Sequence, residues 1–159
     1  MKSLIVFFSC SGVTKNVAHK IANVINGDLY QIQPLTPYSE DDLNWNDNNS
    51  RSSLEMKDMT SRPAIVKDLK NLEQYDSIFV GFPIWWYVAP TIINTFLESY
   101  DFDGKKVIPF ATSGGSGVGD TDVYLQKSCQ GNVKLYQTTM LNGNLTDTRI
   151  NQWIKGLKL

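Results

Sequence analysis

The chain has 159 residues, of which 42% are hydrophobic and 11% aromatic, and its formal net charge is −1 at pH 7. This length and composition predict one globular domain over residues 1–159 and exclude the disordered and fibrous classes. The balanced charge gives no electrostatic attraction to nucleic acid or to an anionic membrane surface, so we expect neither as a partner.

Two strands and a helix are predicted at the start of the chain. Residues 4–8 are apolar without interruption, which is typical of a strand in a parallel sheet that is covered on both faces. Apolar residues recur at helical spacing from 13 to 25, and we expect Asn26-Gly27 to end that helix. Residues 29–33 alternate between apolar and polar side chains, as an edge strand does.

Residues 34–63 are polar, rich in Asn, Ser and Asp, and too long for a simple connection between two elements. Within residues 39–59 we expect short helices around four apolar residues, Leu43, Trp45, Leu54 and Met56. Because the indole of Trp45 needs a place to bury, we interpret residues 34–63 as a cover over the sheet rather than a linker. We name this segment the excursion.

Further buried strands are predicted at 77–82 and 106–112, which are again nearly continuous apolar runs. Pro90 suits the first position of a helix between them, since apolar residues follow it on one face. Pro109 lies inside the 106–112 strand. It conflicts with a central place in the sheet unless a bulge accommodates it.

The last part of the chain is predicted to hold a short helix at 123–130 behind Asp120 and an interrupted strand at 133–136 and 138–141. Thr146 is expected to cap a final helix whose apolar residues have the i, i+3, i+4, i+7 spacing. The alternation of buried strands with helices predicts a doubly wound α/β sandwich.

Signals for export, membrane insertion and metal binding are missing from the sequence. The apolar run after Lys2 is too short for a signal peptide, and no segment is long enough to span a bilayer. Cys10 and Cys129 are too few for a disulfide framework and lack paired zinc-ligand spacing. His19 is the only histidine, which disfavours a histidine-rich metal site and a Ser-His-Asp hydrolase. We expect a cytoplasmic protein without a bound metal.

Residues 9–15, Ser-Cys-Ser-Gly-Val-Thr-Lys, join the first predicted strand to the first predicted helix. Such a loop gathers hydroxyl groups and the free backbone N–H groups of a helix start in one small volume, which suits a phosphate group. The alternative is an ordinary helix cap, since Ser and Thr are common there for local reasons.

A second segment, Pro-Ile-Trp-Trp-Tyr at 83–87, follows the third predicted strand, at the sheet edge where doubly wound proteins bind ligands. Adjacent extended residues face opposite sides, so we expect at least one of Trp85 and Trp86 to face the crevice or solvent. A planar ring system could stack on that indole. The alternative places Trp85 in the core under the first helix and Trp86 against the next helix.

A third segment at 112–119 follows the fourth predicted strand and contains glycine at 114, 115, 117 and 119. Glycines permit close approach of a ligand to the backbone and positive φ angles. The alternative is a flexible surface loop. Together, a phosphate-type loop, an aromatic segment and a glycine-lined segment fit a phosphorylated planar molecule.

With Ser-x-Ser-Gly-x-Thr at 9–14 and Pro-x-Trp-Trp at 83–86, nearly the whole chain resembles the flavodoxin-like proteins, which bind flavin mononucleotide (FMN). The resemblance implies a five-stranded parallel sheet in the order 2-1-3-4-5. It implies phosphate binding by the hydroxyls of Ser9, Ser11 and Thr14 and by the backbone N–H groups of Cys10, Gly12, Val13 and Thr14. It implies that the isoalloxazine ring lies along Pro83, Ile84, Trp85 and Trp86. The ring's pyrimidine side would be lined by Thr112, Ser113, Gly114, Gly115 and Gly117.

Two features differ from the electron-carrying members of that family. Those carriers are often strongly acidic, whereas this chain is nearly neutral, which disfavours docking steered by charge. Carriers also often have a glycine beside the flavin N5 atom, and this chain has none between Pro83 and Tyr87. We therefore expect it to work mainly by two-electron steps.

Other proteins of this architecture are disfavoured by their loop residues. A low-molecular-weight phosphatase would use Cys10 together with an arginine where this chain has Asn16. Response-regulator receivers need acidic residues at the ends of the first and third strands. In this chain those positions are Ser9 and Phe82-Pro83. Rossmann and P-loop signatures are missing. We interpret Cys10 as a small packing residue, the alternative being a thiolate stabilised by the helix start.

Two functional classes remain after these exclusions. The first is an FMN-dependent oxidoreductase that takes hydride from a nicotinamide or passes it to a quinone-like molecule near Trp85 and Trp86. The second is a non-enzymatic electron carrier that docks to partner reductases. A scaffold without flavin is a third alternative. The expected partners are therefore a small-molecule or protein redox partner.

Overall fold

The computed structural model describes residues 2–159 and contains a six-stranded sheet. Its strands are β1 (Ser3–Phe7), β2 (Asp28–Gln31), β3 (Ser77–Pro83), β4 (Lys106–Thr112), β5 (Lys134–Leu135) and β6 (Thr139–Met140). Its helices are α1 (Val13–Ile25), α2 (Arg51–Lys57), α3 (Thr91–Ser99), α4 (Thr121–Ser128) and α5 (Asp147–Leu157), with a short 3₁₀ turn at Leu72–Gln74. Neighbouring strands follow the order β2-β1-β3-β4-β5, β6 also pairs with β4, and every pair is parallel. The predicted sandwich and the order 2-1-3-4-5 are confirmed.

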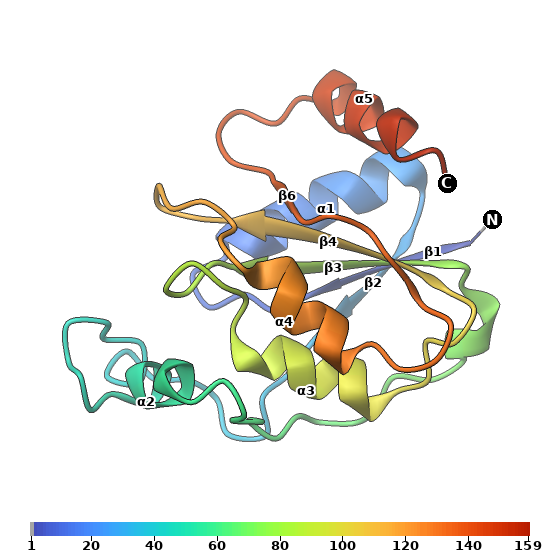
Figure 1. Ribbon diagram of the computed structural model, residues 1–159. Coiled ribbons are helices and arrows are strands. Elements are labelled where there is room, and N and C mark those ends of the chain that lie inside the picture. The colour runs from blue at the N-terminus through green and yellow to red at the C-terminus, as the bar shows by residue number, and fades with distance from the viewer. Residues whose placement is uncertain (1) are drawn as a thin grey trace.

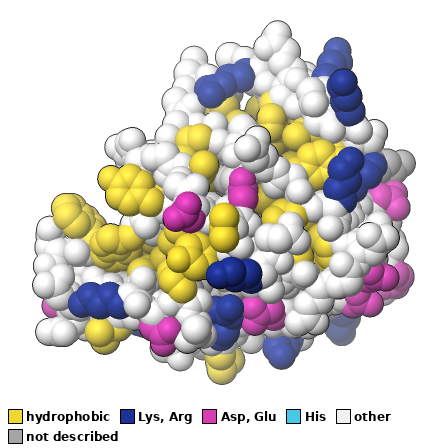
Figure 2. Space-filling view, viewed as in Figure 1, with side chains coloured by type: hydrophobic (Ala, Val, Ile, Leu, Met, Phe, Trp, Pro, Cys, Tyr) yellow, Lys and Arg dark blue, Asp and Glu magenta, His cyan; other side chains and the backbone are white. Residues whose placement is uncertain are grey.

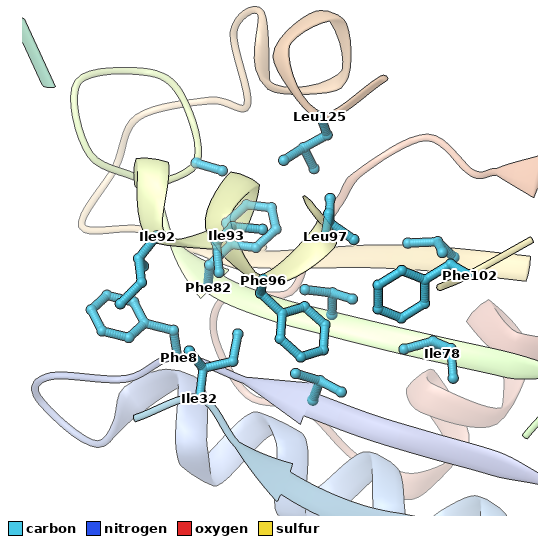
Figure 3. Packing of buried hydrophobic residues seen from close by; sticks show 14 of the residues in the cluster. Phe8, Ile32, Ile78, Phe82, Ile92, Ile93, Phe96, Leu97, Phe102 and Leu125 are labelled. Carbon is cyan, nitrogen blue, oxygen red and sulfur yellow. The ribbon is translucent and has the colours of Figure 1, made fainter. Parts of the chain in front are cut away.

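Helices cover both faces of the sheet, α1 and α5 on one and α3 and α4 on the other (Figure 1). Alternate residues of β1 enter different cores: Leu4 and Val6 pack with α3, whereas Ile5 and Phe7 pack with α1 and α5. This explains why β1 is apolar at every position, since neither face meets water. Figure 3 shows the α3 side, where Phe82 and Phe96 are fully buried. Burial stabilises the fold by about 1.5–3 kcal/mol for each such side chain.

Pro109 occupies the place in β4 where the last strand is interrupted. The Tyr136 N–H donates to the Val107 carbonyl at 2.9 Å, and the Leu141 N–H donates to the Ala111 carbonyl at 2.8 Å. Because alternate residues of a strand face the same neighbour, Pro109 faces the gap between these two bonds. Its missing N–H therefore costs no ladder bond. The pairing register with β4 shifts by one residue between β5 and β6, an irregularity of the bulge type that the sequence required.

The helix ends follow their predicted signals closely. Asn26 adopts the left-handed conformation after α1, and the Thr146 hydroxyl accepts the Arg149 N–H at the start of α5. Pro90 is the residue before α3 rather than its first residue, and α4 begins and ends two residues earlier than predicted. Within residues 2–159, no helix has the length and apolar content needed to cross a membrane.

The excursion differs from its prediction in three respects. It forms one helix, α2, which includes Leu54 and Met56, whereas Leu43 and Trp45 lie in turns before it. The expectation that Trp45 buries its indole is wrong, because the residue is 70% exposed. The expected cover over the sheet is also not found, because α3 and α4 lie over that face. The segment lies to one side, near the start of α3 (Figure 1), where the hydroxyl groups of Ser61 and Thr91 are 2.8 Å apart.

Candidate functional site

Three loops meet at the carboxyl edge of the sheet, after β1, β3 and β4, as the parallel topology requires. Thr112, at the end of β4, joins all three. Its carbonyl accepts the Ile84 N–H at 2.9 Å, and its Oγ1 lies 2.9 Å from the Thr14 Oγ1. The structure therefore brings together the three segments that the sequence singled out.

The β1–α1 loop presents the start of helix α1 without a neutralising group from the described residues. Gly12 precedes the helix with φ 92°, no side chain of residues 2–159 caps α1, and its first turn contains no acidic residue. The Gly12 N–H donates to the Ser9 Oγ at 3.1 Å. A Cβ added at Gly12 would meet no atom within 4 Å, so open space lies beside the loop. The positive end of the helix dipole is thus available to an anion.

The three candidate hydroxyl groups of this loop have different surroundings. Ser11 is exposed, Ser9 accepts the Gly12 N–H, and Thr14 is buried beside Thr112. One hydroxyl of the Thr14 and Thr112 pair donates to the other, so the second O–H remains able to donate to a further acceptor. The Ser9 O–H is likewise not used by the bond that its oxygen accepts. The loop therefore offers hydroxyl donors from Ser9, from Ser11 and from this pair.

Cys10 is not an activated nucleophile. Desolvation by burial raises the pKa of its thiol to about 11, and the nearby Arg51 lowers it only in part. The neutral thiol therefore predominates at physiological pH, which disfavours the thiolate alternative. The residue is exposed overall and lines a cavity of about 300 Å³ with Pro37 and Tyr38 of the excursion.

The β3–α3 loop is a tight turn with two consecutive aromatic residues in the left-handed region. The N–H groups of Trp85 and Val88 donate to each other's carbonyls at 2.9 and 3.2 Å, and Trp86 and Tyr87 between them have φ 48° and 65°. Positive φ at both central residues is the geometry for which Asn-Gly is usual, and it costs about 1–3 kcal/mol at each side chain. The turn's backbone is thus held by two hydrogen bonds, and it presents the side chains of Trp86 and Tyr87 at the surface.

The two indoles of this turn have different environments. Trp85 is half-buried, with its ring 5.7 Å from those of Phe8 and Tyr38 in edge-to-face contact. Trp86 is 46% exposed. The expectation that at least one indole faces the crevice or solvent is confirmed, and the alternative that buries both is wrong.

The β4–α4 loop packs against this turn through Gly119. A Cβ there would lie 2.2 Å from the Tyr87 carbonyl oxygen, and its φ of 49° also favours glycine. By contrast, added Cβ atoms at Gly114 and Gly117 would meet no atom within 4 Å. The loop therefore combines one close contact with an open, side-chain-free surface.

Asn142 anchors the β4–α4 loop from a distant part of the chain. The Ser113 N–H donates to the Asn142 Oδ1 at 2.9 Å, and the Ser113 Oγ donates to the Ser116 carbonyl at 2.6 Å. These bonds disfavour the alternative that this segment is only a flexible surface loop. The sequence analysis missed Asn142, since no local pattern links it to Ser113.

The excursion supplies a further wall that the sequence analysis did not assign to the site. A cavity of about 230 Å³ lies between the excursion and the β3–α3 turn. It is lined by Leu43, Trp45 and Ser52 on one side and by Ile84, Trp85 and Trp86 on the other. The feature of the sequence that could have indicated this wall was Trp45, a large apolar side chain in a polar segment.

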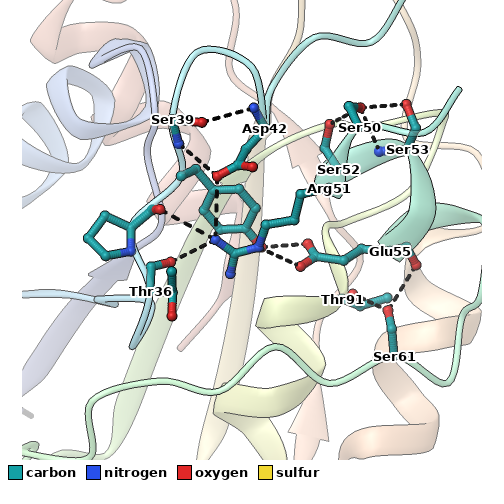
Figure 4. Close-up of polar contacts among 12 residues, drawn as sticks. Thr36, Ser39, Asp42, Ser50, Arg51, Ser52, Ser53, Glu55, Ser61 and Thr91 are labelled. Carbon is teal, nitrogen blue, oxygen red and sulfur yellow. Dashed lines mark hydrogen bonds and ion pairs between the residues drawn. The ribbon is translucent and has the colours of Figure 1, made fainter. Parts of the chain in front are cut away.

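Arg51 fixes the excursion through several contacts that Figure 4 shows together. Its Nε donates to the Glu55 Oε2 at 3.1 Å, its Nη1 donates to the Thr36 carbonyl at 2.7 Å, and its guanidinium lies 3.7 Å from the centre of the Tyr38 ring. The Tyr38 hydroxyl donates to the other Glu55 oxygen at 2.5 Å. Burial, and then Glu55, raise the pKa of Tyr38, so this hydroxyl remains a donor.

Comparison with known proteins gives a consistent family. The family model described as Flavodoxin matches residues 2–157. A candidate flavoprotein from Bacteroides uniformis is 47% identical, with 97% of each chain covered and a TM-score of 0.90. A second one from Bacteroides eggerthii is 42% identical, with 99% of this chain and 98% of that chain covered and a TM-score of 0.93.

Two more distant relatives have named ligands or reactions. A Lactobacillus acidophilus flavoprotein, solved in complex with FMN, has the same fold at 24% identity, with 96% of this chain and 98% of that chain covered and a TM-score of 0.71. The NAD(P)H dehydrogenase [quinone] 1 of Rattus norvegicus is 29% identical over 117 residues. That match spans 59% of this chain and 43% of the rat protein.

Proposed function

The chain belongs to the flavodoxin family, and we propose that it binds FMN and acts as an oxidoreductase on a small redox molecule. The observation that carries this proposal is the junction at Thr112, which ties a helix start suited to a phosphate to the aromatic turn and the glycine loop.

The residues of the three loops fit the phosphate and the ring of FMN. The open side of Gly12 leaves room for a phosphate beside the N–H groups at the start of α1. In the proposed site, the hydroxyls of Ser9, Ser11 and Thr14 and the N–H groups of Cys10, Gly12, Val13 and Thr14 hold the phosphate. The Gly12 N–H, which donates to the Ser9 Oγ in the structure, would exchange that bond for one to the phosphate. Charge-assisted bonds of this kind contribute about 1.5–3 kcal/mol each.

We propose that the isoalloxazine ring lies along residues 83–86, the ring segment of the site. The β4–α4 loop, which we call the glycine loop, lies on the opposite side of the ring. Gly114 and Gly117 have open space where a side chain would stand, which supports close approach of a planar ring. Thr112, Ser113 and Gly115 complete this side. Bound FMN supplies an isoalloxazine ring that accepts and donates hydride or electrons. The protein orients this ring and limits the access of water to it.

Three observations support an enzyme over an electron carrier. The net charge of −1 provides little steering toward a protein partner. The turn at 83–87 contains no glycine, in agreement with two-electron steps. The rat relative is a dehydrogenase whose name includes a quinone. Membership of the flavodoxin family favours the second candidate, a carrier that docks to reductases.

A turnover assay separates the two candidates. The FMN-loaded protein is mixed with NADH or NADPH and a soluble quinone, with no second protein present, and nicotinamide oxidation is followed by absorbance. We expect oxidation that depends on both the protein and the quinone. Flavin reduction that occurs only after a partner reductase is added would favour the carrier and contradict the enzyme.

A further inference from the structure

We propose that the cavity between the excursion and the β3–α3 turn binds an uncharged, planar aromatic molecule of quinone type. Its assignment as the electron acceptor rests on the proposed function, whereas the binding itself does not. The argument starts from the six residues that line the cavity, Leu43, Trp45, Ser52, Ile84, Trp85 and Trp86.

The chemistry of this lining selects against charge. Three indoles and two aliphatic side chains provide flat apolar surface, and none of the six residues is ionisable. An anionic substituent would lose its hydration in the cavity without gaining a cationic partner there. An uncharged ring loses little hydration and gains stacking contacts.

Ser52 supplies one polar group at the wall. The residue is 2% exposed, and its Oγ lies 3.5 Å from the Ser50 Oγ, at the outer limit of a hydrogen bond. The hydroxyl can therefore turn toward a ligand and donate to a carbonyl oxygen. One buried donor in an apolar cavity matches a ring that bears carbonyl groups, as quinones do.

The two outer indoles are exposed at an energetic cost. Trp45 is 70% exposed and Trp86 is 46% exposed, on opposite walls of the cavity. Figure 2 shows hydrophobic side chains gathered at the left of the view, where the excursion and the turn meet. Trp86 also has the positive φ of 48° described above. A ring stacked between the walls would cover both indoles and offset this cost.

The outer wall is built before any ligand arrives. The guanidinium of Arg51, on the helix that contains Ser52, lies 3.7 Å from the centre of the Tyr38 ring, and the Ser52 N–H donates to the Asp42 carbonyl at 2.9 Å. The Tyr38 ring in turn makes edge contacts with Phe8 and Trp85, each with ring centres 5.7 Å apart, which tie the excursion to the sheet and to the turn. Such preorganisation reduces the entropy lost on binding. The excursion is thus a fixed second face for a ligand that lies against the β3–α3 turn.

The size of the cavity limits its ligand. At about 230 Å³ it is smaller than the roughly 300–1,000 Å³ usual for drug-sized ligands. It therefore suits one small ring system rather than a whole nicotinamide dinucleotide. Trp85 and Trp86 also belong to the proposed ring segment of the FMN site, so a molecule in the cavity would lie next to the cofactor.

Equilibrium dialysis of the FMN-loaded protein tests this inference, with menadione as the uncharged probe and 1,4-naphthoquinone-2-sulfonate as its anionic counterpart. We expect menadione to bind and the sulfonate to bind at least about tenfold more weakly. Trp45→Ala should weaken menadione binding about tenfold through lost stacking and leave FMN affinity unchanged. Leu35→Ala is the matched control, because Leu35 is 64% exposed on the same segment but is not part of the cavity lining.

The outcomes separate the inference from the proposed function. Equal binding of the two probes, or an unchanged menadione affinity in Trp45→Ala, would overturn the inference. The inference would also be overturned if menadione bound the flavin-free protein and added FMN abolished that binding. The cavity would then be part of the flavin site. Menadione bound as expected by a protein that takes up no FMN would refute the proposed function and support the cavity assignment.

Discussion

Ser11→Ala isolates the phosphate contact that the proposed site requires. Ser11 is exposed just before α1, so removal of its hydroxyl should change the free energy of unfolding by less than about 0.5 kcal/mol. A lost hydrogen bond to a charged phosphate costs about 1.5–3 kcal/mol, so the Kd for FMN should rise about 10- to 150-fold. Riboflavin lacks the phosphate, and its Kd should not change.

Flavin fluorescence titrations of both ligands measure these constants. Ser99→Ala removes a hydroxyl that bonds the Thr95 carbonyl within α3, and serves as the control with unchanged affinity for both flavins. Thr14→Val would be a poorer test, because it leaves the buried Thr112 hydroxyl without its partner and lowers stability as well. Equal weakening of FMN and riboflavin in Ser11→Ala would refute the phosphate assignment.

Three further predictions concern the loops and the titrating groups. Gly119→Ala should lower the free energy of unfolding by about 2 kcal/mol or more in urea titrations, because its Cβ would clash with the β3–α3 turn. Gly114→Ala is the control: its Cβ would lie in open space, and the free energy of unfolding should fall by less than about 1 kcal/mol. Equal losses in the two variants would contradict the packing described. Cys10 should react with iodoacetamide about tenfold more slowly than a free thiol near pH 8, because its pKa is raised to about 11. Peptide mapping measures the rate of this reaction at Cys10. A rate equal to that of free cysteine would contradict the prediction. Burial and the bond to Asp28 raise the pKa of Tyr75 from 10.0 to about 12, so its stabilising contribution is complete below about pH 10 and is lost as pH rises toward 12. Tyr75→Phe should therefore weaken the alkaline decline in stability, and an unchanged decline would exclude this cause.

Much of the fold was predictable because its signals are local. The run at Leu4–Phe8 predicted β1 and its burial on both faces, and the hydroxyl at Thr146 predicted the start of α5. Pro109 was expected to fit a central strand only if a bulge accommodated it, and the structure places that irregularity in the strand that pairs beside it. The three loops were predicted to meet because parallel strands end at one edge of the sheet.

The remaining parts depend on contacts between distant residues. Trp45 was expected to bury, yet the excursion is held by Arg51 and Tyr38 instead, which leaves the indole free to form a cavity wall. Asn142 reaches the glycine loop from beyond β6. The left-handed residues Trp86 and Tyr87 violate the usual turn preference, so local rules predicted an exposed indole but not the turn that holds it.

The central claim is that a phosphate rests at the start of α1 while a flavin ring lies beside the aromatic turn. Titration of the purified, flavin-free protein with FMN, followed by visible absorption and desalting, tests it most directly. We predict saturation at one FMN per chain, a perturbed flavin spectrum, and retention of FMN but not of riboflavin on desalting. A spectrum that remains that of free FMN at every ratio, with no flavin retained, would contradict the account.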